Sequence, residues 1–274
     1  MKISGKTGIT GIIGYPVEHT LSPAMHNAAF ESLSLDYCYI PFLVHPDNLR
    51  EAVAAIRALN IQGINITVPH KEKVIKYLDN VAEEAAFIGA VNTIVNKKGR
   101  LTGHNTDGAG FMKAMSEAGI TVKGKDILIV GAGGAARAVS FSLSQKAKTV
   151  SIYGRTREKL DSLMSDLKKI RNNVSPCYEL SSLKRYDMVI NATPLGLKKD
   201  DPLPFALENL KKSVVVCDLI YKKTRLVNEA SRYGYDTLDG LGMLLWQGYF
   251  AFKLWTGRTP DISVMRDALL NAKG

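Results

Sequence analysis

The chain has 274 residues, which at roughly 100–200 residues per domain predicts two domains. Its apolar fraction of 46% and charged fraction of 23% are typical of a folded globular protein and exclude a disordered chain. The net charge of +10 favours anionic partners, and because the basic residues are scattered we expect small anionic ligands and no nucleic acid.

The cysteines and the N-terminal residues predict where the chain works. Cys38, Cys177 and Cys217 are far apart and form no Cys-x-x-Cys pair, so we expect neither a metal site nor a disulfide framework. Residues 1–15 lack the long apolar core of a targeting signal, which together with reduced thiols predicts a cytoplasmic protein. The most apolar stretch, residues 241–255, is too short to span a membrane and predicts a buried helix.

The first part of the chain alternates predicted strands and helices. Residues 11–15 and 36–44 predict strands, and residues 49–59 have the apolar spacing of an amphipathic helix. Another helix is expected to begin near Ser22, with Ser22 as its N-cap and Pro23 at the first helical position.

Residues 64–68 predict a strand that ends beside a group of polar residues. Strand alternation puts Asn65 and Thr67 on one face and the apolar side chains on the other. The apolar residues are Ile64, Ile66 and Val68. Pro69 ends the strand and Lys71 follows it, so two polar side chains and a lysine are expected at one strand end.

A hairpin follows in the predicted order of elements. Residues 90–95 predict a strand that carries Asn92, and residues 96–99 suit a hairpin turn. The return strand ends at residues 105–108, where a helix is expected to start near Asp107.

A second alternation of strands and helices begins after the connector at residues 121–125. Its predicted strands span residues 126–130, 149–153, 188–192, 214–219 and 235–238. Strands that alternate with helices predict an α/β fold with a parallel, doubly wound sheet. Two closing helices, at about residues 242–255 and 261–271, lie beyond the last strand.

A glycine-rich run joins the first of these strands to the next helix. It reads Gly131-Ala132-Gly133-Gly134-Ala135-Ala136 and fits the dinucleotide-binding pattern Gly-x-Gly-x-x-Ala in the right context. Gly131 permits the tight turn, Gly133 lets the backbone approach a pyrophosphate, and Ala136 allows close packing of helix on strand. The helix N-terminus offers free N–H groups to the phosphates. The alternative is a purely structural turn.

The second strand of this part indicates which dinucleotide binds. An NAD site usually has an acidic residue there, whereas this chain has Gly154-Arg155-Thr156-Arg157. Arg155 can bind a 2′-phosphate through paired N–H groups, which favours NADP. Arg157 and Lys159 are equally well explained as solvated helix residues.

Several motifs occur in one order along the chain. They are His19-Thr20-Leu21-Ser22-Pro23, Asn65-Ile66-Thr67-Val68-Pro69-His70-Lys71, Gly89-Ala90-Val91-Asn92-Thr93, Asn105-Thr106-Asp107-Gly108, the glycine-rich run, Asn191-Ala192-Thr193-Pro194, and Asp239-Gly240-Leu241-Gly242-Met243 with Gln247. Together they resemble the shikimate dehydrogenase family along nearly the whole chain.

The resemblance implies an NADP-dependent oxidoreductase that reversibly reduces 3-dehydroshikimate to shikimate, a step of aromatic amino acid biosynthesis. It implies a substrate domain of residues 1–106 plus 241–274 and an NADP-binding Rossmann domain of residues 107–240, and it leaves a homodimer open. The catalytic pair of the family corresponds to Lys71 and Asp107. The implied substrate contacts are Thr20, Ser22, Asn65, Thr67, Lys71, Asn92, Asp107, Tyr221 and Gln247. The implied cofactor contacts are Gly131, Ala132, Gly133, Gly134, Ala135, Arg155, Thr156, Ala192, Thr193 and Gly240.

The chemistry of these side chains suits a small carboxylate that carries hydroxyl groups. Thr20 and Ser22 flank a helix start and can donate to a carboxylate. The amides at positions 65, 92 and 247 offer both donors and acceptors to ring hydroxyls. Lys71 can supply the proton that accompanies hydride transfer, and Asp107 can orient and charge-balance it. Taken singly, Lys71 is also explained as a surface lysine and Asp107 as a helix N-cap.

Two departures from the family pattern keep rival functions open. Thr20 stands where the family usually has serine, and Gly154 stands where it usually has asparagine. The nearest alternative is therefore a quinate/shikimate dehydrogenase that accepts NAD. A non-catalytic sensor of NADP and a hydroxy acid is a second alternative, and a nucleic-acid-binding protein is a distant third.

Overall fold

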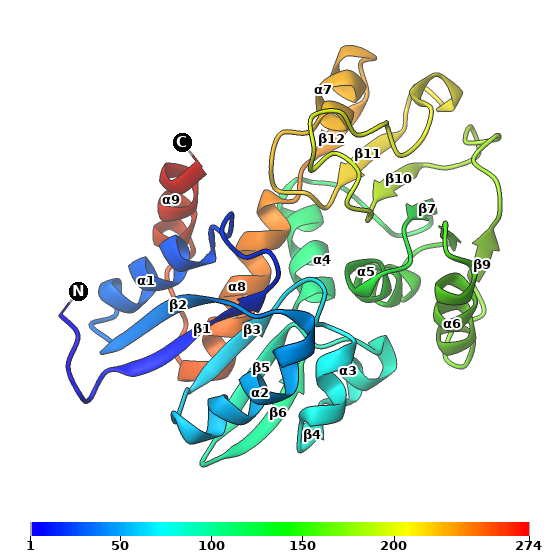
Figure 1. Ribbon diagram of the computed structural model, residues 1–274. Coiled ribbons are helices and arrows are strands. Elements are labelled where there is room, and N and C mark those ends of the chain that lie inside the picture. Colours follow the sequence, from blue (N-terminus) through cyan, green and yellow to red (C-terminus); the bar gives the residue numbers. More distant parts are fainter. Residues whose placement is uncertain (1, 274) are drawn as a thin grey trace. The chain divides into compact units, whose positions relative to one another are not determined.

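The computed structural model describes residues 2–273, and its elements are shown in Figure 1. They group into two compact units, residues 1–106 with 245–274 and residues 107–244. Helix α8 (Leu241–Thr256) begins in the second unit and continues in the first. The expected division at residue 241 lies at the start of this helix, and the assignment of substrate and cofactor to the two units stays a prediction.

The first unit is built on a mixed sheet of six strands in the order β2-β1-β3-β5-β6-β4. The strands are β1 (Gly8–Gly14), β2 (Tyr37–Leu43), β3 (Gly63–Ile66), β4 (Asn80–Val81), β5 (Thr93–Lys97) and β6 (Arg100–His104). β1 runs parallel to β2 and β3, and β5 runs antiparallel to β3 and β6. The ends of β1, β3 and β6 therefore meet at one edge of the sheet, which is where the motif residues of this unit follow.

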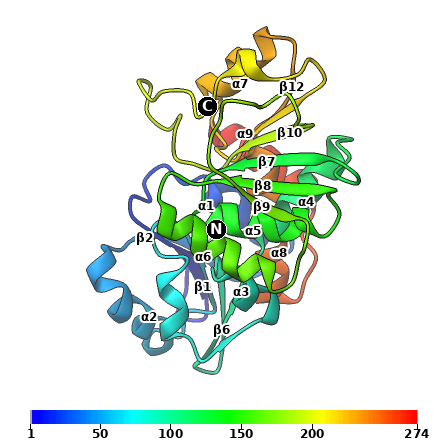
Figure 2. The ribbon, with the colours of Figure 1, turned by 90° about the vertical axis from the view of Figure 1, so that its right-hand side faces the viewer.

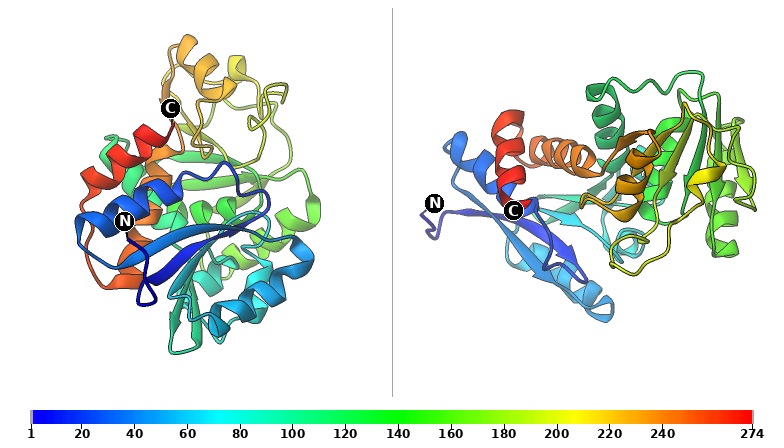
Figure 3. Two further views of the ribbon diagram at one scale, coloured as in Figure 1. Left: turned by 60° about the vertical axis from the view of Figure 1, so that its left-hand side comes forward. Right: turned by 90° about the horizontal axis from the view of Figure 1, so that it is seen from above.

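Helices cover this sheet and complete its core. They are α1 (Ser22–Ser32), α2 (Leu49–Ala58), α3 (Glu83–Ile88), α9 (Ile262–Lys273) and the continuation of α8, with the short 3-10 helices η1 (Pro46–Asn48) and η2 (Lys73–Tyr77). Leu49, Val53 and Ile56 of α2 are buried against the sheet, as the helical spacing predicts. Figure 3 shows α9 (red) beside α1 (blue), so the last helix packs next to the first.

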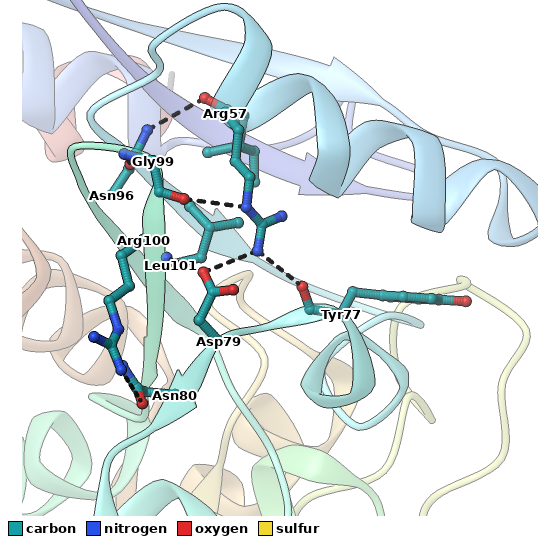
Figure 4. Close-up of polar contacts among 9 residues, drawn as sticks. Arg57, Tyr77, Asp79, Asn80, Asn96, Gly99, Arg100 and Leu101 are labelled. Carbon is teal, nitrogen blue, oxygen red and sulfur yellow. Dashed lines mark hydrogen bonds and ion pairs between the residues drawn. The ribbon is translucent and has the colours of Figure 1, made fainter.

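The predicted hairpin turn is confirmed between β5 and β6. Lys98 and Gly99 both have positive φ, 55° and 85°, which is the twist that a two-residue hairpin turn requires. The amide of Gly99 donates to Oδ1 of Asn96 at 2.8 Å. Figure 4 shows the contact between the hairpin and α2: the Arg57 guanidinium donates to the Gly99 carbonyl at 3.1 Å. The same guanidinium donates to Asp79, just before β4, at 2.9 Å.

The second unit is a sheet of six parallel strands in the order β12-β11-β10-β7-β8-β9. The strands are β7 (Asp126–Val130), β8 (Thr149–Tyr153), β9 (Val174–Cys177), β10 (Met188–Asn191), β11 (Val215–Asp218) and β12 (Asp236–Leu238). Figure 2 shows β7 and β8 side by side, in agreement with their parallel register. The order reverses between β7 and β10, and in such sheets ligands bind beyond the carboxyl ends of the strands at this reversal.

The second unit also contains helices before, between and after these parallel strands. They are α4 (Asp107–Glu117), α5 (Gly134–Ser144), α6 (Arg157–Lys168), α7 (Arg225–Arg232), the first residues of α8 and the 3-10 helix η3 (Leu207–Asn209). The predicted α/β fold class, with a doubly wound parallel sheet, is confirmed. None of the helices within residues 2–273 is long and apolar enough to cross a membrane.

Candidate functional site

The start of α1 presents two hydroxyl groups of the first unit. Ser22 is the first residue of α1 and is buried, while Leu21 is the N-cap. The predicted N-cap role of Ser22 is therefore wrong: its own amide donates to the hydroxyl of Thr20 at 3.3 Å, so Thr20 supplies the oxygen at this helix start. The Ser22 side chain lies near enough to the hydroxyl of Tyr39 in β2 to lower the pKa of that hydroxyl, against the larger effect of burial.

Tyr39 connects α1 with β3 and was missed in the sequence. Its hydroxyl donates to Oδ1 of Asn65 at 2.8 Å, and burial raises the pKa of Tyr39 well above its ordinary value. The backbone of Tyr39 is held by the amide of Asn27, which accepts from its N–H at 2.8 Å and donates to its carbonyl at 3.1 Å. The only indication of Tyr39 in the sequence is an aromatic residue in a predicted strand, which is more often part of the core.

Asn65 and Asn92 form the centre of a buried polar network. Nδ2 of Asn65 donates to the Asn92 carbonyl and to Oγ1 of Thr93, each at 3.1 Å. Oγ1 of Thr93 donates to Oδ1 of Asn92 at 3.0 Å. Nδ2 of Asn92 donates to Thr106 at 2.9 Å and to Oε1 of Gln247 at 3.4 Å. The structure thus joins the predicted residues Asn65, Asn92 and Gln247 by hydrogen bonds with Tyr39, Thr93 and Thr106, and Ser22 lies beside Tyr39. We call this set the strand-end network.

The segment after β3 carries Thr67 and Lys71. β3 ends at Ile66, and Val68 is 66% exposed, so the prediction that the strand continues to Val68, with Ile64, Ile66 and Val68 on one face, is wrong. The chain leaves the strand at Thr67, which is half-buried. Lys71 is also half-buried, and its carbonyl accepts from the amide of Val91 at 2.8 Å, which fixes its backbone beside the start of β5.

Two predicted substrate residues lie in the second unit. Asp107 is buried and is the first residue of α4, as the helix start predicted. Tyr221 follows β11 and is half-buried, and burial raises the pKa of its hydroxyl. The other predicted substrate contacts belong to the first unit.

The glycine-rich run turns between β7 and α5, at the reversal of the strand order. Gly131 has φ of 129°, and a Cβ there would lie 2.7 Å from the Ala192 carbonyl oxygen, so only glycine fits. Its amide donates to the Tyr153 carbonyl at 2.7 Å, which pins the turn between β8 and β10. Gly133 differs because a Cβ there would meet no atom within 4 Å. Nothing within the protein requires glycine at that position, which suits the close approach of a pyrophosphate.

Ala132, Gly134 and Ala135 complete this turn, and all three are half-buried. Gly134 is the first residue of α5, whose N-terminal N–H groups are a general binding site for phosphate. The residues of the turn therefore fit a dinucleotide.

The arginine after β8 lies at the surface. Arg155 is exposed, and Thr156 is the N-cap of α6. Arg157 forms an ion pair with Asp161 at 3.3 Å and lies over the Tyr178 ring at 4.1 Å, so it acts as a helix residue. These contacts leave Arg155 as the stronger candidate to bind a 2′-phosphate.

The strand ends of β10 and β11 hold a second buried network. Oδ1 of Asn191 accepts from the amide of Thr193 at 3.0 Å and from its hydroxyl at 2.7 Å. Nδ2 of Asn191 donates to Asp218 at 3.1 Å. Ala192 and Thr193 are half-buried. Gly240 is buried, and a Cβ there would overlap the Leu219 carbonyl oxygen. The loops with these predicted cofactor residues are therefore packed closely beyond the ends of β10, β11 and β12.

Comparison with known proteins identifies the family. The family model described as "Shikimate dehydrogenase substrate binding domain" matches residues 12–94, "Shikimate / quinate 5-dehydrogenase" matches residues 113–197, and "Shikimate 5'-dehydrogenase C-terminal domain" matches residues 240–270. A curated protein of Desulforamulus reducens, named shikimate dehydrogenase (NADP(+)), is 45% identical over 98% of this chain and 96% of its own. The chain belongs to the shikimate dehydrogenase family.

Solved structures of shikimate dehydrogenases share this fold. One in complex with NADP+ has a TM-score of 0.92 and 42% sequence identity, and the match covers 100% of this chain and 98% of that chain. A second, from Thermus thermophilus in complex with NADP(H) and shikimate, has a TM-score of 0.88 and 36% identity over 97% of this chain and 100% of that chain. The predicted membership of the shikimate dehydrogenase family is confirmed, and the curated relatives are named as NADP-dependent enzymes.

Proposed function

We propose that this shikimate dehydrogenase family member is an oxidoreductase that reversibly reduces 3-dehydroshikimate to shikimate with NADPH. The observation that carries the proposal is the buried strand-end network of hydroxyls and amides in the first unit. The same chain holds a dinucleotide turn at the strand reversal of the second unit and Arg155 beyond its second strand. The curated relative at 45% identity is named for this activity.

The residues that bind substrate are assigned by their chemistry. Thr20 and Ser22 donate to the carboxylate, since both hydroxyls lie at the start of α1. The strand-end amides and Thr67 contact the ring hydroxyls, and Tyr221 contributes from the second unit near the carboxylate. The strand-end amides are Asn65, Asn92 and Gln247.

Lys71 and Asp107 handle the proton. When NADPH is bound, its nicotinamide supplies the hydride. Lys71 donates a proton to the carbonyl oxygen of the substrate during reduction and takes it back during oxidation. Asp107, which is buried at the start of α4, orients the lysine and balances its charge.

The cofactor is assigned to the second unit. The turn residues Gly131, Ala132, Gly133, Gly134 and Ala135 hold the pyrophosphate at the N-terminus of α5. Arg155 and Thr156 contact the 2′-phosphate side, and Ala192, Thr193 and Gly240 line the nicotinamide side. The half-buried backbone of the turn and the space at Gly133 support this assignment.

Steady-state assays with shikimate or quinate and with NADP or NAD test the proposal. We expect the shikimate–NADP pair to give the highest kcat/KM. A higher kcat/KM for quinate with NAD would favour the alternative of a quinate/shikimate dehydrogenase. Binding of both ligands without any change in reduced-nicotinamide absorbance would favour a sensor.

Paired variants test the residue roles. Lys71→Ala is expected to lower kcat by ~10²–10⁴-fold, as loss of a general acid does. The matched control is Lys73→Ala, at an exposed position two residues along, which should leave kcat unchanged. Arg155→Asp should shift the preference from NADP towards NAD, whereas Arg157→Asp should not. Unchanged cofactor preference in Arg155→Asp would remove Arg155 from the cofactor site.

The remaining predictions concern partners and location. A homodimer is tested by sedimentation, the absence of nucleic-acid binding by titration with duplex and single strands at low salt, and the cytoplasmic location by cell fractionation.

A further inference from the structure

Asp218 is a buried carboxylate at the end of β11, and it is 1% exposed. It lies outside every motif that points to the function. Three neutral groups donate to it: Nδ2 of Asn191 and the amide of Ile220, each at 3.1 Å, and the hydroxyl of Thr224 at 2.7 Å. Burial, and to a smaller extent the charge of Asp239, raise the pKa of Asp218.

These donors belong to different loops. Asn191 ends β10, and its Oδ1 accepts from both the amide and the hydroxyl of Thr193. Its second Nδ2 hydrogen bond goes to the Leu195 carbonyl at 3.0 Å. The orientation of the Asn191 amide is therefore fixed by Asp218 on one side and by the loop of residues 192–196 on the other.

The other two donors enclose Tyr221. Ile220 precedes it, and Thr224 follows it as the N-cap of α7, where its hydroxyl accepts from the amide of Val227 at 3.3 Å. The Ile220 carbonyl accepts from the amide of Gly240 at 3.1 Å, so this loop is also joined to the end of β12. Both ends of the segment that carries Tyr221 are thus fixed by one carboxylate.

We propose that Asp218 is a positioning residue that sets the loop bearing Tyr221 and the loop bearing Thr193 relative to each other. It does not touch the ligands in this assignment. It acts through the Asn191 amide towards Thr193 and through Ile220 and Thr224 towards Tyr221. The inference rests on the proposed function, in which Thr193 lies at the cofactor and Tyr221 at the substrate.

Two substitutions separate the geometry of Asp218 from its charge. Asp218→Ala removes all three acceptor contacts and leaves buried donors without a partner, which is costly. Asp218→Asn keeps Oδ1 for Asn191 and Ile220, and its new N–H₂ can donate to the hydroxyl of Thr224. The Asn variant should therefore keep KM for shikimate and for NADP within about 3-fold of wild type, whereas the Ala variant should raise both by about 10-fold.

A double-mutant cycle with Tyr221→Phe tests whether Asp218 acts through Tyr221. If it does, Tyr221→Phe changes KM for shikimate less in the Asp218→Ala background than in wild type, by about 2-fold or more. Asp201→Ala is the matched control, because Asp201 also accepts two backbone amides, those of Gly196 and Lys198, but is only half-buried, and both amides lie outside the segment that carries Tyr221. The fold-changes in KM for shikimate caused by Asp201→Ala and by Tyr221→Phe should multiply in the double variant, as they do for independent sites.

A second pair of variants covers the case in which Asp218→Ala does not fold. Thr224→Val removes one donor to Asp218, and Thr224→Ser restores it, so Ser should return KM for shikimate to the wild-type value. Multiplicative effects of Asp218→Ala and Tyr221→Phe, or equal KM values in Thr224→Val and Thr224→Ser, overturn the inference. If wild type itself does not oxidise shikimate with NADP, the proposed function fails instead.

Discussion

The burial of His26 leads us to predict that the protein loses stability in mild acid. It is completely buried in α1 of the first unit, stacked on Tyr39 with ring centroids 4.5 Å apart and an interplanar angle of 12°. Within residues 2–273 neither ring nitrogen has a hydrogen-bond partner. Burial lowers the pKa of His26 from 6.5 to about 3. The imidazole is therefore neutral in the folded protein across the range in which an unfolded chain would protonate it.

The sign and size of the effect follow from proton linkage. Below pH 6.5 the unfolded chain binds a proton at His26 and the folded chain does not. The free energy of unfolding therefore decreases as the pH is lowered from 6.5 to about 3. Each pH unit in this range costs about 1.4 kcal/mol, so His26 should remove about 1.4 kcal/mol of unfolding free energy between pH 7.5 and 5.5. His26→Phe keeps an aromatic ring against Tyr39 and has no such dependence.

Urea unfolding followed by tryptophan fluorescence measures this effect. The two tryptophans, Trp246 and Trp255, both belong to the first unit, so the signal reports that unit. The free-energy difference between wild type and His26→Phe should shift by about 1.4 kcal/mol, in favour of the variant, when pH is lowered from 7.5 to 5.5. The control is His45→Phe at an exposed position, where no comparable shift is expected. If the free energy of unfolding changed equally with pH in wild type and in His26→Phe, the argument would be refuted, because the folded protein would then accept the charged imidazole.

Further variants test the glycine-rich turn of the second unit and the strand-end network of the first. Gly131→Ala should lower the melting temperature and weaken NADP binding, because its Cβ would lie 2.7 Å from the Ala192 carbonyl oxygen at a φ of 129°. Gly133→Ala, the matched control, should weaken NADP binding but keep the melting temperature, since its Cβ meets nothing within 4 Å. Equal melting temperatures for both variants would contradict this reading of the turn. Tyr39→Phe should raise KM for shikimate and leave KM for NADP unchanged, because Asn65 loses the donor to its Oδ1 at a cost of about 1–3 kcal/mol. An equal rise in both KM values would point to a general loss of structure instead.

Much of the second unit could be predicted because its strands are short apolar runs between glycine-rich or polar turns. The prediction of 149–153 matches β8 (Thr149–Tyr153), and that of 126–130 matches β7. β9 (Val174–Cys177) was missed, since it is an edge strand that contains Pro176 and lacks a continuous apolar run. The two-residue strand β4 is too short to leave any periodicity.

Errors at the first unit's strand and helix ends have local causes. The alternation of apolar and polar residues predicted a strand that continues to Val68, but the chain turns at Thr67. The amide of Thr67 still donates to the Ile13 carbonyl at 2.9 Å, whereas Val68 is exposed to solvent. At α1 the sequence offers two hydroxyls two residues apart, and either could act as a cap. The helix begins one residue earlier than a Ser22 cap would require, so Ser22 is turned inward and becomes available to Tyr39.

The strand-end network shows what a list of residue types cannot supply. An asparagine in a sequence offers two donor hydrogens and an acceptor, so Asn65 was expected to serve a ring hydroxyl in either sense. In the structure both hydrogens are used, by the Asn92 carbonyl and by Thr93. Its Oδ1 accepts from Tyr39 and keeps one lone pair. A substrate hydroxyl that contacts Asn65 must therefore donate its hydrogen to Asn65. This direction is set by partners of Asn65 that lie 26 to 28 residues away in the sequence, which a list of residue types does not show.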